Sequence, residues 1–405
     1  MKLPRLLLSG VYQWELPASK SLSNRWLIIN HLCNSSIRFN NLSQAGDTAL
    51  LQQLLKQLTL GADNTYHCQN AGTVARFITA LLATREGTFT VTCNQRMKQR
   101  PIAELIKALR FMGAKIRYLE QEGFLPAEIQ GVQLKGGKVR LSGKESSQFA
   151  SALILVAPTM TQPLTIQFDS RPVSKSYISM TCNVLKSCGA QVEERDEVIK
   201  VDAVTFTPPT GVSIEKDWSS AAYAYNAVAF SPQSSIFLPQ LGSNSFQGDK
   251  AAAEWYSRLG VETTFFNNGI LLKNNGVKSQ SPLVFHCSDN PDLVPPLAVA
   301  CAGLGTEALF LQIDTLNLKE SRRLEALSTE LSKIGCPNVA THNSLHISPS
   351  QLSVKEKIKT YNDHRLAMSF ATLACLSDSL EIDNPDSVEK SFPNFFEQLL
   401  NPKKI

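Results

Sequence analysis

The sequence predicts a mixed α/β protein with two domains, on the evidence of its length, its composition and an internal repeat. The chain has 405 residues, and chains beyond about 250–300 residues usually divide into more than one hydrophobic core. Its 43% hydrophobic and 19% charged residues are typical of a soluble globular protein. The repeat alternates helices with strands, so each core should combine both kinds of element.

A helix, a glycine and a strand follow one another several times along the chain. Glycine ends a helix easily because it adopts the left-handed conformation without a side-chain clash. The last four of these glycines are 76, 71 and 75 residues apart, and the first interval is 52 residues. This near-even spacing favours a duplicated unit of helices and strands. The predicted helices with their glycines are 50–60 with Gly61, 102–112 with Gly113, 178–188 with Gly189, 251–259 with Gly260 and 324–334 with Gly335.

Charge and cysteine content argue against several classes of protein. The net charge of +5 is too small for the basic surface of a nucleic-acid-binding protein, although it allows a local cationic pocket for small anions. The nine cysteines occur singly, which argues against a disulfide framework or zinc site and fits a cytoplasmic protein with reduced thiols. The apolar run at 6–8 is too short for a signal peptide, and no stretch approaches the roughly 20 apolar residues of a membrane helix.

One group of motifs collects cations and hydroxyl groups at predicted helix starts. Lys20, Ser21 and Arg25 lie near the start of a helix predicted over 26–32, where backbone N–H groups and the helix dipole favour a phosphate. Gly72 precedes the next such helix and allows a ligand to approach the backbone closely. An ordinary capped helix or tight turn also explains each motif, so none is specific alone.

Three further segments have the same character. Residues 96–101 place three cations before a helix, in a segment that the final proline is predicted to keep extended. A solvent-exposed charge run explains these cations equally well. The segments 146–149 and 174–177 place hydroxyl groups before helices, where they can cap the helix or bind a phosphate.

A second group of motifs adds carboxylates. Asp292 precedes an apolar helix and can cap it or face a substrate hydroxyl, and Glu320 lies within one turn of three cations. Asp363 beside His364 is predicted to form a hydrogen-bonded pair that orients Arg365. Many cations with few carboxylates indicate a site that binds a multiply anionic ligand and keeps one or two acid–base groups.

Taken in order, these motifs resemble the 5-enolpyruvylshikimate-3-phosphate (EPSP) synthase family along nearly the whole chain. The resemblance implies two similar domains, each of three βαβαββ units, with the active site in the cleft between them. It assigns residues 19–215 to the domain on the shikimate 3-phosphate side, and residues 1–18 with 216–405 to the second domain. The matching segments are PASKSLSNR at 17–25, NAGTVAR at 70–76, RMKQRP at 96–101, SSQF at 146–149, SKSY at 174–177, QGD at 247–249, DNPD at 289–292, LKESRR at 318–323, YNDHRLAM at 361–368 and KSFP at 390–393.

The resemblance also implies a reaction. Members of the family transfer the enolpyruvyl group of phosphoenolpyruvate to the 5-hydroxyl of shikimate 3-phosphate and release phosphate, through a non-covalent tetrahedral intermediate. This is a step of aromatic amino acid biosynthesis and the target of glyphosate. It implies an enzyme with no metal or organic cofactor, with these two small molecules as partners and with no nucleic acid or membrane partner. A monomer in the cytoplasm is the implied state.

Matched position by position, the resemblance implies a role for individual residues. Asp292 is similar to the base near the 5-hydroxyl, and Glu320 to the group that adds and removes the proton at C3. Lys20 would contact both substrates and serve in proton transfer. The implied phosphoenolpyruvate contacts are Lys20, Gly72, Arg100, Gln148, Arg323, Arg365 and Lys390. The implied shikimate 3-phosphate contacts are Ser21, Arg25, Ser146, Ser147, Gln148, Ser174, Tyr177, Asp292 and Lys319.

Departures from the family pattern leave two alternatives open. Arg322 stands where the family usually has aspartate, so a carboxylate that would orient Arg323 is expected to be absent, and Asn317 stands where arginine is common. One alternative is a weakened paralogue that only binds phosphorylated metabolites. The other is UDP-N-acetylglucosamine 1-carboxyvinyltransferase, which shares the fold and the donor but needs another acceptor site and usually a reactive cysteine.

Overall fold

The computed structural model describes residues 1–33, 37–202, 207–277, 282–378 and 380–405. The chain forms two compact units, which we call the middle unit (Lys20–Ile214) and the terminal unit (Met1–Ser19 with Glu215–Ile405). The terminal unit is therefore built from both ends of the chain. Which unit binds which substrate stays a prediction.

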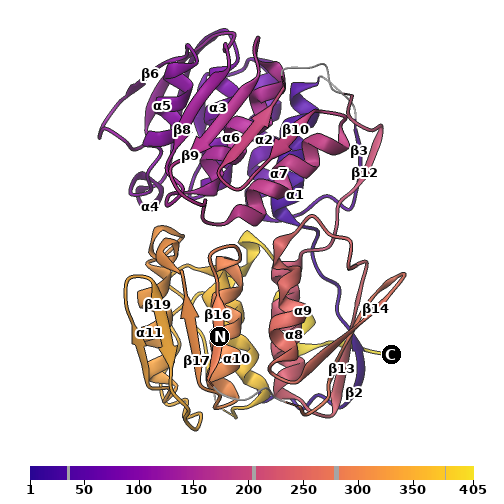
Figure 1. The fold of residues 1–405 in the computed structure, drawn as a ribbon. Helices are drawn as coiled ribbons and strands as arrows, with labels where there is room; N and C mark the ends of the chain where they lie inside the picture. Colours follow the sequence, from indigo (N-terminus) through magenta and orange to yellow (C-terminus); the bar gives the residue numbers. More distant parts are fainter. Residues whose placement is uncertain (34–36, 203–206, 278–281, 379) are drawn as a thin grey trace. The chain divides into compact units, whose positions relative to one another are not determined.

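The middle unit contains helices and short strands that alternate along the chain (Figure 1). Its helices are α1 (Lys20–Leu32), α2 (Gly46–Leu60), α3 (Gly72–Ala83), α4 (Gln95–Lys98), α5 (Ala103–Phe111), α6 (Ser147–Val156), the 3₁₀ helix η1 (Ala157–Thr159) and α7 (Lys175–Ser187). Its strands are β3 (Arg38–Asn40), β4 (Thr65–His67), β5 (Gly87–Thr92), β6 (Lys115–Tyr118), β7 (Ala127–Gly131), β8 (Gly137–Leu141), β9 (Leu164–Phe168), β10 (Val192–Glu194), β11 (Val198–Val201) and β12 (Gly211–Ser213).

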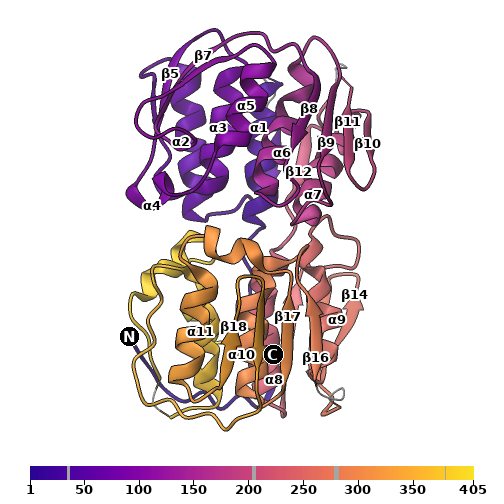
Figure 2. The same cartoon turned by 60° about the vertical axis from the view of Figure 1, so that its left-hand side comes forward.

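The terminal unit has the same alternation, with several 3₁₀ helices (η) (Figure 2). Its helices are α8 (Trp218–Phe230), η2 (Gly248–Ala251), α9 (Ala252–Ser257), η3 (Pro291–Leu293), α10 (Val294–Gly303), η4 (Asp314–Leu318), α11 (Arg323–Lys333), α12 (His364–Ala371), η5 (Thr372–Cys375), η6 (Pro385–Lys390) and α13 (Phe395–Leu400). Its strands are β1 (Lys2–Leu3), β2 (Gly10–Gln13), β13 (Ser234–Pro239), β14 (Val261–Phe266), β15 (Gly269–Asn274), β16 (Leu283–His286), β17 (Ala308–Leu311), β18 (Asn338–Ala340), β19 (Ser344–Ile347), β20 (Leu380–Glu381) and β21 (Lys403–Lys404).

Each unit contains two complete βαβαββ repeats within its described residues. In every complete repeat the first two strands pair in parallel across a helix, and the last two form a hairpin that adds antiparallel to the second strand. The resulting sheets have the orders β4-β5-β7-β6 and β8-β9-β11-β10 in the middle unit, and β16-β17-β19-β18 and β21-β2-β13-β15-β14 in the terminal unit, where β21 adds a fifth strand beside β2. Among the described residues, the remaining part of each unit forms a two-stranded sheet, β3-β12 in the middle unit and β1-β20 in the terminal unit. The predicted mixed α/β fold of repeated units is confirmed.

Helices fill the interior of each unit, and the sheets lie on the outside (Figures 1 and 2). In the terminal unit α8 packs against α10, and α10 packs against α12. Every residue of α8 and α12 is buried, as expected of helices that neighbouring elements surround on all sides.

All five predicted helix–glycine pairs are confirmed. Helix α2, for example, ends at Gly61, whose φ of 62° is left-handed and whose N–H donates to the carbonyl of Gln57. The other four glycines also have positive φ values. A glycine at the end of a predicted helix is a reliable signal, because the left-handed backbone conformation found there favours glycine whatever its tertiary contacts.

Two expectations about helix boundaries are wrong. Helix α1 begins at Lys20 rather than at 26. Its first residues include the polar Ser23, Asn24 and Arg25, so the sequence shows no apolar helical pattern there. The structure nevertheless buries these three side chains. The cations of 96–101 do not lie in an extended segment, since residues 95–98 form the short helix α4. Proline disfavours helix only for the residue directly before it, which leaves the preceding turn free to close.

Candidate functional site

The terminal unit gathers two predicted carboxylates around one buried arginine. Arg323 is the first residue of α11 and is 1% exposed. It donates to Asp292 at 3.2 Å, to Glu320 at 2.6 Å, and to both oxygens of Asp363 at 2.8 and 3.2 Å. Burial alone lowers the pKa of an arginine, but the three carboxylates, Asp363 first, hold the pKa of Arg323 above its ordinary value. A buried guanidinium of this kind is tolerated because it is fully paired.

Asp292 lies in η3 and faces three cations. It accepts a hydrogen bond from Arg365 at 2.6 Å and another from Arg323, and the Lys319 ammonium lies 3.9 Å from its carboxylate. Burial by itself raises the pKa of Asp292, but Arg365, then Lys319 and Arg323, bring the pKa well below the usual range. The carboxylate does not cap the following helix, since no side-chain cap bond is formed at η3 or α10 in the described chain. Asp292 is therefore ionised, partly buried and turned toward cations.

Glu320 lies in the turn just before α11 and has cations on both of its oxygens. One oxygen accepts the 2.6 Å bond from Arg323, and the other lies 3.4 Å from the ammonium of Lys390. The side chain is 16% exposed, so a ligand can reach it. The structure thus brings together the predicted terminal-unit residues Asp292, Lys319, Glu320, Arg323, Arg365 and Lys390.

Asp363 has a different role from the one predicted. The distance of 3.9 Å between its carboxylate and the Nδ1 of His364 exceeds a hydrogen bond, so the expected Asp–His pair is not formed. Instead Asp363 caps α12 by accepting from the Arg365 backbone N–H at 3.0 Å, and it also accepts from Ser321 at 2.9 Å and from Arg323. One fully buried carboxylate thereby fixes the starts of α11 and α12 together.

The expected loss of a carboxylate beside Arg323 is also corrected. Arg322 turns to the surface, where it pairs with Glu325 at 2.8 Å, and its side chain is 70% exposed. Asp363 supplies the orienting carboxylate instead. The substituted position is therefore peripheral to the cluster.

In the middle unit, a glycine makes room for a cation. A Cβ atom added to Gly72 would lie 2.5 Å from a terminal nitrogen of Arg100, so the guanidinium packs directly on the backbone at the start of α3. Arg76 lies close by and donates to the Gly72 carbonyl at 3.3 Å. Burial, and next the charge of Arg100, lower the pKa of Arg76. Two neighbouring buried guanidinium groups favour an anion beside them.

Gln148 joins this group from α6. Its side-chain amide donates to the hydroxyl of Thr73 at 3.3 Å, next to Gly72. Its buried Oε1 atom has no hydrogen-bond partner among the described residues. Ser146 caps α6 through the backbone N–H of Gln148 at 3.3 Å, and Ser147 is the first residue of that helix. Residues of three predicted motifs, 70–76, 96–101 and 146–149, therefore meet at one place.

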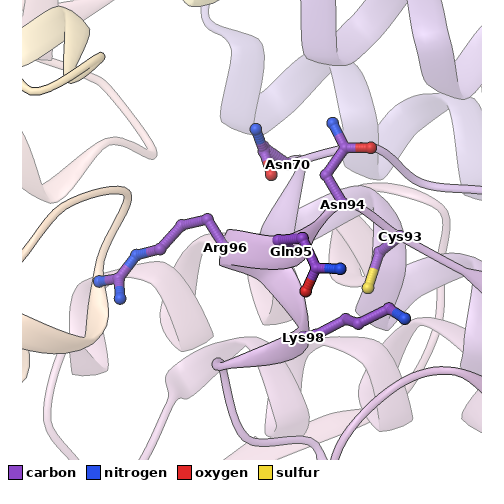
Figure 3. Close-up of a pocket in the computed structure, with 6 residues that line it drawn as sticks. All are labelled: Asn70, Cys93, Asn94, Gln95, Arg96 and Lys98. Atoms are coloured by element: carbon purple, nitrogen blue, oxygen red, sulfur yellow. The ribbon is translucent and has the colours of Figure 1, made fainter.

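A pocket of about 500 Å³ lies beside the segments 70–76 and 96–101 (Figure 3). Asn70 reaches it from the loop before α3, and Arg96 and Lys98 reach it from α4. Figure 3 shows Arg96 extending in the opposite direction from Lys98, whose ammonium pairs with Glu120 at 2.5 and 2.8 Å. The remaining lining residues are Cys93, Asn94 and Gln95.

Lys20 and Arg25 share α1 but differ in their surroundings. The Lys20 ammonium is at the N-terminal end of the helix and pairs with Asp47 at 3.1 Å. Arg25 is buried, and burial lowers its pKa to about 10. It donates to the Tyr177 and Ser21 carbonyls and to the hydroxyls of Thr181 and Ser151. Arg25 thus connects α1 to α6 and α7.

Ser174 occupies an unusual backbone conformation. It precedes α7 with a φ of 55° and makes no side-chain cap bond with that helix. Left-handed backbone is costly for a residue with a side chain, and such strain is often found at ligand sites. Tyr177, expected before the helix, lies within its first turn.

Sequence reasoning missed two residues near these groups, Asp47 and Thr73, and it missed the buried contacts of Asp249 and Asp363. Asp249 is 3% exposed and accepts from Asn290 at 3.0 Å and from Ser219. Burial, and then the charge of Asp292, raise its pKa. The QGD segment carried this residue, but neither its burial nor its partners are visible in a sequence.

The described residues contain neither a cluster of metal-ligating side chains nor a membrane-spanning helix. Within those segments, no group of three or more His, Cys, Asp or Glu side chains is arranged to hold a metal ion. No helix there has the length and apolar character needed to cross a membrane.

The ion pairs of Asp292 predict a pH-dependent stability. An unfolded aspartate has a pKa of about 3.9, and the folded value is lower. The pairs therefore stabilise the protein fully above about pH 5, and this contribution is lost as the pH falls through about 4 and below. In urea unfolding, Asp292→Asn should be less stable than wild type at pH 7, and the difference should shrink between pH 5 and 3.

The exposed Asp378, which pairs with Arg5 at the surface, provides the control. Asp378→Asn should show no measurable difference from wild type at either pH. A gap between Asp292→Asn and wild type that widens as the pH falls would contradict the assigned ion pairs.

Known proteins resemble this chain over nearly all of its length. The family model described as EPSP synthase (3-phosphoshikimate 1-carboxyvinyltransferase) matches residues 59–399. A 3-phosphoshikimate 1-carboxyvinyltransferase of Bacteroides fragilis (strain YCH46) is 40% identical over 392 residues, covering 95% of this chain and 93% of the relative. The protein of that name from Tolumonas auensis is 33% identical over 406 residues, covering 94% of each.

A solved structure gives the same result for the fold. EPSP synthase from Acinetobacter baumannii superposes with a TM-score of 0.78, covering 98% of this chain and 96% of the other, at 20% sequence identity. At that identity the similarity speaks for the fold, whereas the family model and the 40% identical relative speak for descent. On the evidence of the family model and of this relative, the chain belongs to the EPSP synthase family.

Proposed function

We propose that this protein transfers the enolpyruvyl group of phosphoenolpyruvate to the 5-hydroxyl of shikimate 3-phosphate and releases phosphate. The observation that carries the proposal is the pair of carboxylates, Asp292 and Glu320, that share the buried guanidinium of Arg323. Such a pair provides two proton-transfer groups within a strongly cationic surrounding. The name carried by the relatives fits that chemistry.

The reaction needs an addition and an elimination. In the addition, the 5-hydroxyl oxygen bonds to C2 of the enol, its proton leaves, and C3 gains a proton. In the elimination, the bond between C2 and the phosphate oxygen breaks, C3 loses a proton, and the double bond forms again. Each step requires a positioned acid or base and fixed cations near the developing charge.

Asp292 is the proposed acceptor of the hydroxyl proton. In the structure the positive charge of Arg365 lowers the pKa of Asp292, which makes its carboxylate a weaker base. When the anionic donor binds, Arg365 would share its charge with the donor, and the pKa of Asp292 would rise toward its ordinary value. Donor binding would then activate the base for the acceptor hydroxyl.

Glu320 is the proposed group that gives a proton to C3 and later removes it. Lys390 and Arg323 lie on its two oxygens and would hold the carboxyl group in one orientation. With Arg365, these cations form the proposed clamp for the phosphate and carboxylate of the donor, since charge-assisted bonds to such oxygens are strong.

The middle unit contributes the remaining proposed contacts. The guanidinium of Arg100 on Gly72, with Gln148 beside it, suits a phosphate oxygen. Lys20, at the start of α1, is the proposed proton donor to the leaving phosphate. When the substrates bind, its ammonium group would leave Asp47 and contact the substrates instead. The proposed contacts of shikimate 3-phosphate are Ser21, Arg25, Ser146, Ser147, Gln148, Ser174, Tyr177, Asp292 and Lys319. The Arg25 guanidinium would act mainly by holding the three helices that carry several of them.

The alternative acceptor, UDP-N-acetylglucosamine, is not favoured. Cys93 is the cysteine nearest the cationic motifs, yet it is 5% exposed, and burial raises the pKa of its thiol to about 11. A thiol of that kind is a poor nucleophile. We further propose that the protein acts as a cytoplasmic monomer without a cofactor and that glyphosate competes with phosphoenolpyruvate.

The direct test is a phosphate-release assay with purified protein. Phosphate should appear when phosphoenolpyruvate and shikimate 3-phosphate are both present, and neither substrate alone should release it. Phosphate release only with UDP-N-acetylglucosamine would overturn the proposed acceptor. Binding of both substrates by calorimetry without any phosphate release would overturn the proposed catalysis.

Glu320→Gln tests the proton transfer at C3. The amide keeps the shape of the side chain but cannot exchange a proton, so kcat should fall by about 10²–10⁴-fold while the dissociation constant of shikimate 3-phosphate changes little. Glu325→Gln is the matched control, because Glu325 lies on the same segment, half exposed, and pairs with Arg322. Equal kcat values for the two variants would remove Glu320 from the mechanism.

Gly72→Ala tests the contact with Arg100. The added methyl group would displace the guanidinium, so KM for phosphoenolpyruvate should rise by about tenfold, the effect of losing roughly one charged hydrogen bond. In Gly242→Ala the new Cβ meets nothing within 4 Å, and its kinetics should equal those of wild type. An unchanged KM in Gly72→Ala would place the donor elsewhere.

A further inference from the structure

Glu330 is a buried carboxylate that no step of the proposed reaction uses. It lies on α11 and is 0% exposed. Its oxygens accept from the ammonium of Lys333 at 2.8 and 3.0 Å, from the backbone N–H of Lys359 at 3.0 Å and from the hydroxyl of Tyr361 at 2.8 Å. A pair with Lys333 alone would need no burial, because residues three apart can pair at a helix surface. The two bonds to 359–361 therefore call for another explanation.

The segment that Glu330 holds has an unfavourable backbone. Tyr361 and Asn362 are consecutive residues with φ values of 55° each. Left-handed backbone at two neighbouring residues with side chains persists only where the surroundings impose it. On its other side the segment is held by Asp383, which accepts from the Thr360 N–H at 2.6 Å, and by Asn384, which donates to Asn362.

This strained turn leads directly into the cluster. Asp363, which holds Arg323, follows Asn362, and Arg365, which holds Asp292, comes two residues later. The Asp363 N–H closes the turn by donating to the Thr360 carbonyl at 2.8 Å. The direction in which the chain leaves the turn thus decides where both side chains lie.

Helix α11 grips the segment at two points. Arg323 holds Asp363, and Glu330 holds Lys359 and Tyr361. The two helix residues are seven positions apart, which is two turns on one face, or roughly 10 Å along the axis. If the bonds from Glu330 are lost, the contact between Arg323 and Asp363 remains, and the segment can rotate about that contact.

We propose that Glu330 is a positioning residue: by bracing the turn at 359–362, it sets the orientation of Asp363 and Arg365 in the donor clamp. The kinetic consequence rests on the function proposed above. The structural consequence, a more mobile turn when the brace is cut, does not depend on that function.

Tyr361→Phe is the most informative variant. It removes one hydrogen bond to Glu330 and keeps the ring of a side chain that is 39% exposed, so folding should be preserved. We expect kcat/KM for phosphoenolpyruvate to fall by about fivefold, with the dissociation constant of shikimate 3-phosphate within about twofold of wild type. Glu330→Gln, which also breaks the pair with Lys333, should lower kcat/KM by about tenfold or more.

Thr329→Ala is the matched control. Thr329 is the neighbouring residue of α11, is exposed, and bonds only to its own helix among the described residues. Its kinetics should match those of wild type. If Tyr361→Phe lowers the melting temperature but leaves kcat/KM equal to that of Thr329→Ala, Glu330 is structural only and the proposal is wrong.

Hydrogen exchange separates this inference from the proposed function. Without any substrate, the amides of Asp363 and Arg365 should exchange about tenfold faster in Tyr361→Phe than in wild type, whereas amides within α11 should be unchanged. If wild type releases no phosphate, the proposed function fails, and the exchange result alone decides the role of Glu330. Equal exchange at Asp363 and Arg365 in both proteins would overturn it.

Discussion

The arrangement of the terminal unit depends on the burial of one guanidinium group. Arg323 is almost inaccessible to water, and a buried charge is stable only when it is paired and hydrogen-bonded. Its carboxylate partners come from three separate segments, at positions 292, 320 and 363. These segments must therefore converge wherever the unit folds. These carboxylates also pair with Arg365, Lys319 and Lys390. The four cations and three carboxylates together carry one net positive charge, which favours the binding of an anion.

The middle unit makes an anion site by a different physical route. There Lys20 pairs with Asp47 and Lys98 pairs with Glu120, but no cluster of several carboxylates around one guanidinium is found among the described residues. Arg100 and Arg76 lie together over the start of α3, and the first of them needs the missing side chain of Gly72. The two units share a fold pattern, but one positions its cations with acids and the other with close backbone packing.

The sequence was sufficient for the fold class, for the helix ends marked by glycine and for the family. These features can be predicted because each depends on a short stretch of sequence, such as a glycine at a helix end or a motif of six residues, and not on contacts between distant residues. The start of α1 was missed because its polar residues are buried by tertiary contacts that the sequence does not display. The role of Asp363 was misjudged for the same reason: its neighbour in sequence, His364, is not its partner, whereas Arg323 lies 40 positions away. Which residues bind which substrate stays a prediction.

The position of strand β2 has a consequence for the newly made chain. This strand lies between β13 and β21 in its sheet, and Gly10 pairs with Ser234, which is 224 positions later. At roughly 5–20 residues per second, ribosomes would need about 10–45 s to supply that partner. The middle unit ends at Ile214, 20 residues before Ser234, so it can begin to fold roughly 1–4 s before that partner is made, while β2 still lacks its sheet.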